Sequence, residues 1–223
     1  MDGRCLPLCI EARRSEVLLA DIGNTYFHIY DGNRVEHLSY AEAIERYRDM
    51  PLYYISVKHD LEIKMTQMKK WKNISNAIFI EGEYETMGVD RKALCLSHKE
   101  GVFVDAGSAI TVDVIEGELY RGGYILPGLQ AYLQSYTTIS SALDVSLDEK
   151  IALDRLPRTT KEQISYGIIA SIKVLIDKHR NAKKLYFTGG DGKFLSTLFD
   201  DALYDETLVF QGMMKAIKDK KIC

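Results

Sequence analysis

The stretches VLLADIGNTYFHIY (17–30) and GVFVDAGSAITVDVI (101–115) decide the fold of this chain. In each, an apolar strand leads into Asp-x-Gly and a small polar residue, and a second apolar strand follows. The glycine of each turn (Gly23 or Gly107) permits close backbone approach, and the backbone N–H groups of such a turn suit phosphate oxygens. The carboxylate before each glycine stands at a strand end, where it can hold a cation. Two such turns predict two related halves that grip a nucleotide polyphosphate.

Composition narrows the functional class. The 223 residues are 46% hydrophobic and 27% charged, with a net charge of −3, which is ordinary for a globular protein and gives no electrostatic reason to expect nucleic acid or a membrane surface as a partner. No apolar run approaches the roughly 20 residues that span a bilayer. We therefore expect a cytoplasmic protein whose cysteines are free thiols rather than zinc ligands or disulfides. The cysteines are Cys5, Cys9, Cys95 and Cys223.

Hydrophobic patterning predicts an α/β chain in two halves, 17–99 and 100–223, after an N-terminal segment, 1–16, that matches no element. The segment is interpreted as a flexible tail or as the product of an upstream start codon. Each half is expected to open with a three-stranded meander and to continue with helices and further strands. Further strands are expected at 52–57, 76–80 and 184–188, and helices at 40–48, 60–70, 89–98, 129–136, 159–179 and 209–221. The helix at 159 carries two candidate capping boxes, Thr159 with Glu162 or Thr160 with Gln163.

Other phosphate-binding motifs are missing from the sequence. GGDGKF (189–194) places Phe194 where a P-loop has Ser or Thr. No Gly-x-Gly-x-x-Gly follows a predicted strand, which argues against a dinucleotide-binding Rossmann domain.

Five short motifs together resemble a known family. DIGNT (21–25), DAGSAITVD (105–113) and FTGG (187–190) look like the two phosphate motifs and the adenosine motif of the actin-like acetate and sugar kinase superfamily. Within it, GVDR (88–91) and GGYILPG (122–128) resemble the type III pantothenate kinases. The resemblance implies a duplicated ribonuclease-H-like (actin-like ATPase) fold with mixed sheets and two βββαβα-type halves. It also implies a homodimer that uses ATP to phosphorylate pantothenate, the first step of coenzyme A biosynthesis.

By the same resemblance, the GVDR motif carries the catalytic base. Phosphoryl transfer needs mainly positioning, charge compensation and a carboxylate that accepts the hydroxyl proton. The motif assigns that base to Asp90 and substrate binding to Gly88, Val89, Asp90 and Arg91, whose guanidinium suits the carboxylate of pantothenate. From the residues alone, Asp90 would instead be read as a helix cap with Arg91 in a solvated ion pair.

Two further residues match substrate contacts of the family. Tyr84 is one, and an ordinary loop aromatic is the alternative. Thr160 is the other, and a helix cap is its alternative; the two roles are compatible because the positive end of a helix favours an anionic ligand.

The nucleotide and ion sites are likewise assigned by resemblance. Ser108 supplies the hydroxyl of the second phosphate turn, where the family more often has Thr. Asp105 corresponds to the ligand of a monovalent cation, potassium or ammonium, and magnesium is expected to accompany ATP near Asp21. Asp113 is assigned no role beyond a contact with residues that themselves line the site. The first ATP-phosphate loop comprises Asp21, Ile22, Gly23, Asn24, Thr25, Tyr26, Phe27 and His28.

Two alternative functions stay open at this point. One is phosphorylation of another small alcohol, such as a sugar, by a kinase of the same superfamily. The other is a non-enzymatic transcriptional accessory protein on the same fold, for which degraded catalytic motifs would be expected.

Overall fold

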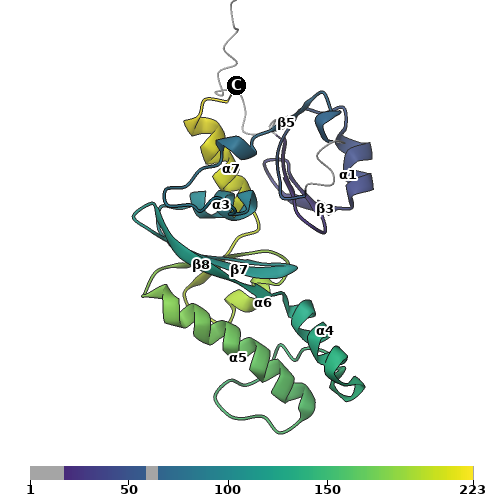
Figure 1. Ribbon diagram of the computed structural model, residues 1–223, viewed down its shortest axis with the longest axis vertical. Helices are drawn as coiled ribbons and strands as arrows, with labels where there is room; N and C mark the ends of the chain where they lie inside the picture. Colours follow the sequence, from purple (N-terminus) through teal and green to yellow (C-terminus); the bar gives the residue numbers. More distant parts are fainter. Residues whose placement is uncertain (1–17, 59–64, 223) are drawn as a thin grey trace, which may run out of the picture. The chain divides into compact units, whose positions relative to one another are not determined.

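A computed structural model describes residues 18–58 and 65–222 and divides the chain into two compact units. Unit 1 is formed from 1–97 and 207–223, and unit 2 from 98–206, within the described ranges. The C-terminal helix is therefore grouped with unit 1, whereas the second half predicted from the sequence ran over 100–223. Figure 1 follows the chain through both units.

A few expectations fall on residues outside the described ranges. The tail expected at 1–16 lies outside them. So does the first part of the helix expected over 60–70; in its described part, Met65 and Thr66 are helical. Of the four cysteines, Cys95 is described, and it is a buried free thiol.

Unit 1 contains a five-stranded mixed sheet in the order β3-β2-β1-β4-β5. β1, β2 and β3 form the expected antiparallel meander, and β4 and β5 add in parallel on the other side of β1. The strands are β1 (Leu18–Ile22), β2 (Phe27–Tyr30), β3 (Val35–Leu38), β4 (Leu52–Ser56) and β5 (Trp71–Asn73), and the helices are α1 (Tyr40–Tyr47), α3 (Val89–Leu96), α7 (Leu208–Asp219) and the 3-10 turn η2 (Ser75–Ala77).

Helices cover both faces of this sheet. α1 begins at a capping box between Ser39 and Glu42 and packs on one face through Ala43 and Tyr47. α3 and α7 lie side by side against the other face, so closely that a Cβ at Gly212 would overlap the carbonyl oxygen of Ala93.

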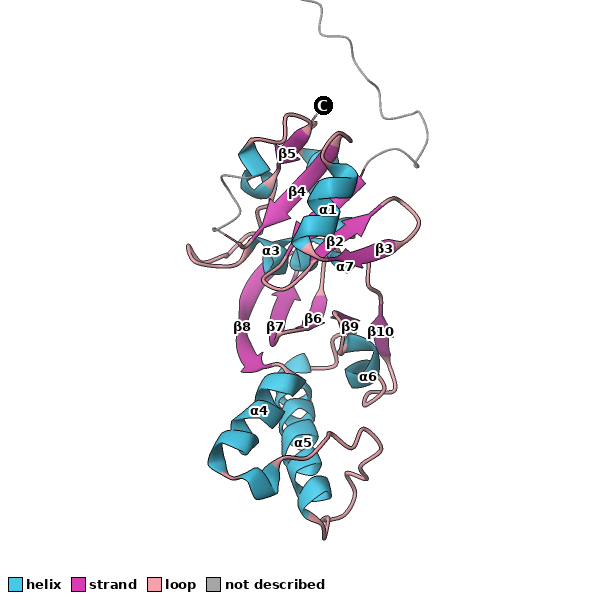
Figure 2. Ribbon diagram, turned by 90° about the vertical axis from the view of Figure 1, so that its right-hand side faces the viewer, coloured by secondary structure: helices cyan, strands magenta, loops and turns pink. Residues whose placement is uncertain are grey.

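Unit 2 repeats the sheet in the order β8-β7-β6-β9-β10. β6, β7 and β8 are antiparallel, and β9 and β10 add in parallel beyond β6; Figure 2 shows these strands in magenta. The strands are β6 (Gly101–Ala106), β7 (Ala109–Glu116), β8 (Leu119–Pro127), β9 (Leu185–Thr188) and β10 (Ala202–Tyr204), and the helices are α4 (Leu129–Ile139), α5 (Thr160–Arg180), α6 (Gly192–Ser196) and the 3-10 turn η3 (Ser141–Leu143).

The long helix α5 packs against the second sheet. Its buried stripe of isoleucines belongs to the same core cluster as the buried residues on one face of β6 and β7, as the 3.6-residue period predicts. The stripe comprises Ile164, Ile168, Ile172 and Ile176. The helix begins with the Thr159–Glu162 capping box, which settles the two alternatives that the sequence left open.

The two sheets have the same strand order and the same strand directions, with β1 to β5 matched in turn by β6 to β10. The expected duplicated ribonuclease-H-like architecture is therefore confirmed. One local expectation was wrong. The strand expected over 76–80 is absent, and the edge position is taken by β5, whose three residues are too few to show an alternating pattern. The pairing of β10 with β9 and the short helix α6 were not expected.

Candidate functional site

The first Asp-Gly turn lies at the carboxyl end of β1. Ile22 and Phe27, which flank the turn, are fully buried and pair across the hairpin, so they anchor it in the core. Gly23 donates its N–H to the carbonyl oxygen of Tyr26 at 3.2 Å, and the residues between them are exposed. The predicted loop 21–28 thus consists of two core anchors and an exposed, hydrogen-bonded turn.

Two side chains from outside the hairpin hold the carbonyl groups of this turn. The hydroxyl of Tyr40, at the start of α1, donates to the carbonyl oxygen of Gly23 at 2.6 Å. The ammonium of Lys58, which follows β4, donates to the carbonyl oxygen of Asn24 at 3.1 Å. Because the carbonyl oxygens are engaged in this way, the conformation of the turn is fixed by contacts with α1 and with the end of β4.

His28 lies beside Asp21 in the sheet. The two residues are register partners across β1 and β2, and His28 in turn pairs with His37 on β3. The Nδ1 atoms of the two imidazoles are 2.6 Å apart, so one donates its proton and the other accepts it. Burial and the neighbouring His37 lower the pKa of His28 to about 4. The imidazole of His28 is therefore neutral at physiological pH and supplies no positive charge to the turn.

The second Asp-Gly turn joins β6 to β7 in unit 2. Gly107 donates its N–H to the carbonyl oxygen of Ala109 at 3.0 Å. Ser108 is exposed at the tip of the turn, as a phosphate-binding hydroxyl must be. Two glycines from distant segments close over the turn. A Cβ at Gly128 would overlap the carbonyl oxygen of Gly107, and a Cβ at Gly189 would lie 2.5 Å from the Asp105 carboxylate.

Threonine side chains flank Asp105 on both neighbouring strands. Asp105 is the register partner of Thr111 on β7 and of Thr188 on β9. The Oγ1 atom of Thr111 is buried and has no hydrogen-bond partner among the described residues. A carboxylate with hydroxyl oxygens around it is a donor set for a hard cation, because such ions prefer oxygen ligands. In the described parts of the chain, no group of three or more His, Cys, Asp or Glu is arranged to hold a metal ion.

Asp113 lies on the same strand as Thr111 but is fully buried. It accepts a hydrogen bond from the hydroxyl of Tyr120 at 3.1 Å, and it pairs across the sheet with Gly123, where a Cβ would lie 2.5 Å from its Oδ1 atom. These contacts place Asp113 within the sheet interior.

The GVDR motif forms the first turn of α3, with Gly88 as its N-cap. The Oδ1 atom of Asp90 accepts the N–H of Arg91 at 2.8 Å, which satisfies one amide of the helix start. Arg91 is 6% exposed, and its Nη1 donates to the hydroxyl of Tyr84 at 2.7 Å. The structure therefore brings together a carboxylate, a guanidinium and a phenol that the sequence predicted separately.

Thr160 occupies the first helical position of α5 and is exposed. The cap is its neighbour Thr159, so the capping alternative for Thr160 is wrong. Its hydroxyl lies at the amino end of a 21-residue helix, where an anionic group is favoured.

Five residues that shape the two turns received no role of their own from the sequence, although three of them lie within the quoted motifs. The two threonines could have been found from the alternation of β7 and β9, which puts them on the same face as Asp105. Contacts from distant segments leave no such signal in a single sequence. The five are Tyr40, Lys58, Thr111, Gly128 and Thr188.

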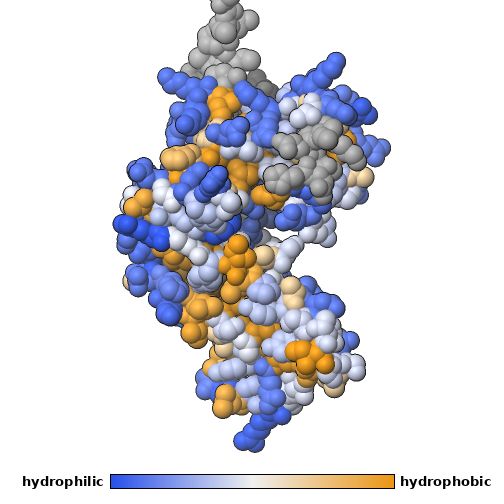
Figure 3. Space-filling view, in the orientation of Figure 1, coloured by the Kyte–Doolittle hydropathy of each residue, from blue (hydrophilic) through white to orange (hydrophobic). Residues whose placement is uncertain are grey.

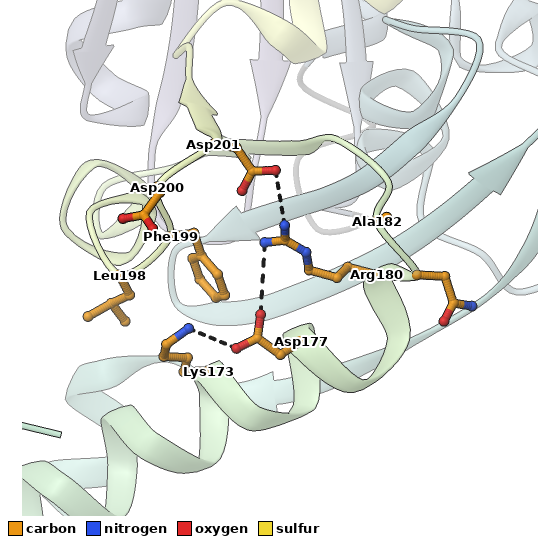
Figure 4. A pocket seen from close by; sticks show the side chains of 9 residues that line it. Lys173, Asp177, Arg180, Ala182, Leu198, Phe199, Asp200 and Asp201 are labelled. Carbon is orange, nitrogen blue, oxygen red and sulfur yellow. Dashed lines mark hydrogen bonds and ion pairs between the residues drawn. The ribbon is translucent and has the colours of Figure 1, made fainter. Parts of the chain in front are cut away.

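A separate hollow of about 620 Å³ lies at the carboxyl end of α5 (Figure 4). Lys173 pairs with Asp177 at 2.8 Å, and Arg180 pairs with Asp201 at 3.0 Å, so the charges around it are largely matched. α5 leads directly into the amino end of β9, whereas Asp105 lies at the carboxyl end of β6. The hollow is therefore at the opposite end of the strands from the second turn.

Comparison with known proteins assigns the chain to a family. The sequence model of the family described as type III pantothenate kinase matches residues 50–182. A type III pantothenate kinase of Helicobacter hepaticus is 41% identical over 203 residues, which cover 91% of this chain and 98% of that protein.

Solved structures agree with this fold. A conserved Campylobacter jejuni protein assigned to a Baf family of transcriptional activators superposes with a TM-score of 0.85 at 38% identity, covering 92% of this chain and 100% of that one. The activator of the 2-hydroxyisocaproyl-CoA dehydratase from Clostridium difficile, solved with bound ADPNP, gives a TM-score of 0.54 at 8% identity over 93% of this chain and 97% of its own. The latter likeness concerns the fold alone.

Proposed function

Because this chain belongs to the type III pantothenate kinase family, we propose that it transfers a phosphoryl group from ATP to pantothenate. The product is 4′-phosphopantothenate, and the step opens coenzyme A biosynthesis. The observation that carries the proposal is the cluster of Asp90, Arg91 and Tyr84 at the start of α3. It combines a base for a hydroxyl with a binding group for a carboxylate, and pantothenate carries both of the groups that these residues would meet.

In this mechanism Asp90 orients the 4′-hydroxyl and accepts its proton as the oxygen attacks phosphorus. The N–H of Arg91 holds the Oδ1 atom of Asp90, which fixes the plane of the carboxylate before substrate arrives. A guanidinium has five N–H donors, so Arg91 can contact Tyr84 and the pantothenate carboxylate together. Gly88 and Val89 complete the substrate-binding segment, and the family resemblance assigns a substrate contact to Thr160 as well, in this subunit or in its partner.

The ATP phosphates are assigned to the loop 21–28 and to Ser108. ATP-using kinases require a divalent ion such as magnesium, which neutralises phosphate charge when bound. The carboxylate of Asp21, at the end of β1, would hold that ion together with phosphate oxygens and water.

A monovalent cation, potassium or ammonium, is proposed at Asp105. The buried hydroxyl oxygen of Thr111 supports this proposal because it has no partner among the described residues and stands next to Asp105 in the sheet. Bound there, the cation would add positive charge beside the second phosphate turn.

We also propose that the enzyme is a homodimer. Of the eleven residues of α4, Leu129 is buried, and Tyr132, Leu133 and Tyr136 pack partly buried against the core of unit 2. Ile139 at its end is 71% exposed, and Leu156 is 80% exposed. Figure 3 shows hydrophobic surface over the region of α4. A second copy would cover this surface.

The site of action is proposed to be the cytoplasm. In the described parts of the chain, no helix has both the length and the apolar character needed to cross a bilayer.

The test is a coupled assay of ADP formation with and without pantothenate, repeated with sodium in place of potassium. Pantothenate should stimulate turnover, and potassium should stimulate it further. Asp90→Asn should abolish turnover while thermal unfolding and ATP binding stay unchanged. Asp49→Asn, at an exposed position in the same unit, is the matched control and should behave as wild type. Near-normal turnover in Asp90→Asn would remove Asp90 from its proposed role.

The same assay separates the alternatives. A panel of sugars and other alcohols tests for another acceptor, and higher kcat/KM for any of them would replace pantothenate as the substrate. A wild-type protein that shows no turnover with any acceptor would favour a non-enzymatic role. The similar Campylobacter jejuni structure is described as a Baf family transcriptional activator, which is why this role is tested.

A further inference from the structure

The first phosphate turn carries no positive charge of its own. Residues 21–28, DIGNTYFH, contain neither lysine nor arginine. The one other basic side chain of the segment, His28, lies on β2 after the turn and is hydrogen-bonded to His37, with the two Nδ1 atoms 2.6 Å apart. A turn that binds the phosphates of ATP must otherwise depend on backbone N–H groups and on the divalent ion.

Lys58 brings a cation to this turn from another strand. β4 runs parallel to β1, with Ser56 as the register partner of Ile22. The N–H of Val57 continues this ladder to the carbonyl oxygen of Ile22 at 3.2 Å. The chain therefore leaves β4 at the same edge of the sheet as the turn. Lys58 follows directly, and its Nζ atom lies 3.1 Å from the carbonyl oxygen of Asn24.

The ammonium is held in a defined place. Its Nζ atom stands 4.6 Å from the ring centroid of Tyr40, within the range of a cation–π contact. The hydroxyl of the same ring donates to the carbonyl oxygen of Gly23 at 2.6 Å. Tyr40 thus supports both the turn and the lysine, so the ammonium and the turn keep a fixed separation.

The ammonium can contact an anion without releasing the turn. An ammonium has three N–H donors, and among the described residues the carbonyl oxygen of Asn24 takes only one. Asn24 and Thr25 are exposed residues, and a phosphate oxygen bound beside them would lie within reach of the remaining donors. Charge-assisted hydrogen bonds to phosphate are among the stronger polar contacts in proteins.

We propose that Lys58 is a ligand of the ATP polyphosphate and supplies the fixed positive charge that the first phosphate turn lacks. The inference rests on the proposed function, because it takes the turn at 21–28 to be the phosphate site. A purely structural role, in which Lys58 only ties the carbonyl oxygen of Asn24, makes different predictions.

The experiment compares three substitutions that separate charge from hydrogen bonding. Lys58→Met removes both, Lys58→Gln keeps an N–H donor without charge, and Lys58→Arg keeps the charge. The control is Lys72→Met, since Lys72 also stands over a tyrosine ring, at 5.7 Å from that of Tyr53, but on the edge strand β5. Calorimetry measures the Kd of a non-hydrolysable ATP analogue with magnesium, and the Kd of adenosine. Thermal unfolding and the KM for pantothenate are recorded for each variant.

Lys58→Met and Lys58→Gln should raise the Kd of the ATP analogue at least tenfold and leave adenosine binding, Tm and the KM for pantothenate near wild type. Lys58→Arg should stay within about threefold of wild type, and Lys72→Met should not differ from it. Wild-type affinity in Lys58→Met would overturn the inference, and so would wild-type affinity in Lys58→Gln alone, which would indicate the structural role. If wild type binds the analogue but does not phosphorylate pantothenate, the proposed function is wrong. The role of Lys58 as a phosphate ligand is then still tested by the Kd values of the variants.

Discussion

Gly88→Ala offers a way to move the catalytic carboxylate without changing its charge. Gly88 is the N-cap of α3 with φ −57° and ψ 138°, a conformation open to any residue. A Cβ built there would lie 2.5 Å from the Oδ1 atom of Asp90, and its next neighbours, the Asp90 Cγ atom at 3.7 Å and a methyl of Val57 at 3.9 Å, are at ordinary distances. The new methyl group would therefore press on the Asp90 carboxylate alone.

The size of the effect follows from that contact. A carbon and an oxygen need about 3.2 Å, so the carboxylate oxygen must move by roughly 0.7 Å, and a misplacement of about 1 Å in a catalytic constellation costs on the order of 100-fold in rate. We expect kcat to fall roughly 10- to 100-fold. Loss of the Asp90–Arg91 hydrogen bond and the poorer N-cap should together lower the free energy of unfolding by only about 1–2 kcal/mol.

The assay is steady-state kinetics with pantothenate, together with urea unfolding. Gly167→Ala is the matched control, because a Cβ at this helical position meets only the Tyr136 hydroxyl at 3.8 Å. It should keep kcat and raise stability by roughly 0.5–1 kcal/mol. A kcat for Gly88→Ala within twofold of wild type would refute the reasoning, because the position of the Asp90 carboxylate would then not matter to the reaction.

Three further outcomes test other parts of the structure. The pKa of His28, lowered to about 4 from an ordinary 6.5 by burial and by His37, means that between these pH values the unfolded chain binds more protons. The free energy of unfolding should therefore rise as pH increases from 4 to 6.5, by about 3 kcal/mol at most and roughly 2 kcal/mol after allowance for partial exposure. Urea titrations at several pH values should show a steeper dependence of the unfolding free energy on pH in wild type than in His28→Gln. The same pH dependence in both proteins would contradict the lowered pKa of His28. Gly212→Ala should lower the free energy of unfolding by roughly 2–3 kcal/mol in urea titrations, because its methyl group would overlap the Ala93 carbonyl between α3 and α7. Gly107→Ala has open space for its Cβ, so it should keep its Tm but lose ATP affinity at least tenfold by calorimetry; unchanged affinity would place the phosphates elsewhere.

Much of the fold could be read from the sequence because local pattern and global topology agree. The stretches 17–30 and 101–115 each encode two strands and the turn between them, so a hairpin follows from neighbouring residues alone. The 3.6-residue spacing of the isoleucines in α5 likewise predicted an amphipathic helix. The strand order around these hairpins was predicted by family resemblance rather than by the residues, since parallel pairing leaves no local mark.

The parts that could not be predicted depend on contacts between distant segments. Tyr40 and Lys58 reach the first turn from 17 and 34 positions away along the chain. Each would pass for a surface residue in the sequence. Trp71 begins an edge strand of three residues, which is too short to show alternation. The packing of α7 in unit 1 likewise joins the last helix to α3, and no local pattern in either helix indicates that pairing.

The two aspartates stand at equivalent positions in the two sheets, but their neighbours in the sheets differ. Asp21 lies between His28 and Ile55 on the adjacent strands, whereas Asp105 lies between Thr111 and Thr188. A neutral imidazole and a hydrocarbon offer no oxygen to a cation, but two hydroxyls do. Under the proposed function, the neighbours of Asp105 therefore suit a monovalent cation, whereas a magnesium ion at Asp21 would take its other ligands from phosphate oxygens and water. In the first half positive charge must come with the nucleotide or from outside the hairpin, which is the role that the position of Lys58 allows.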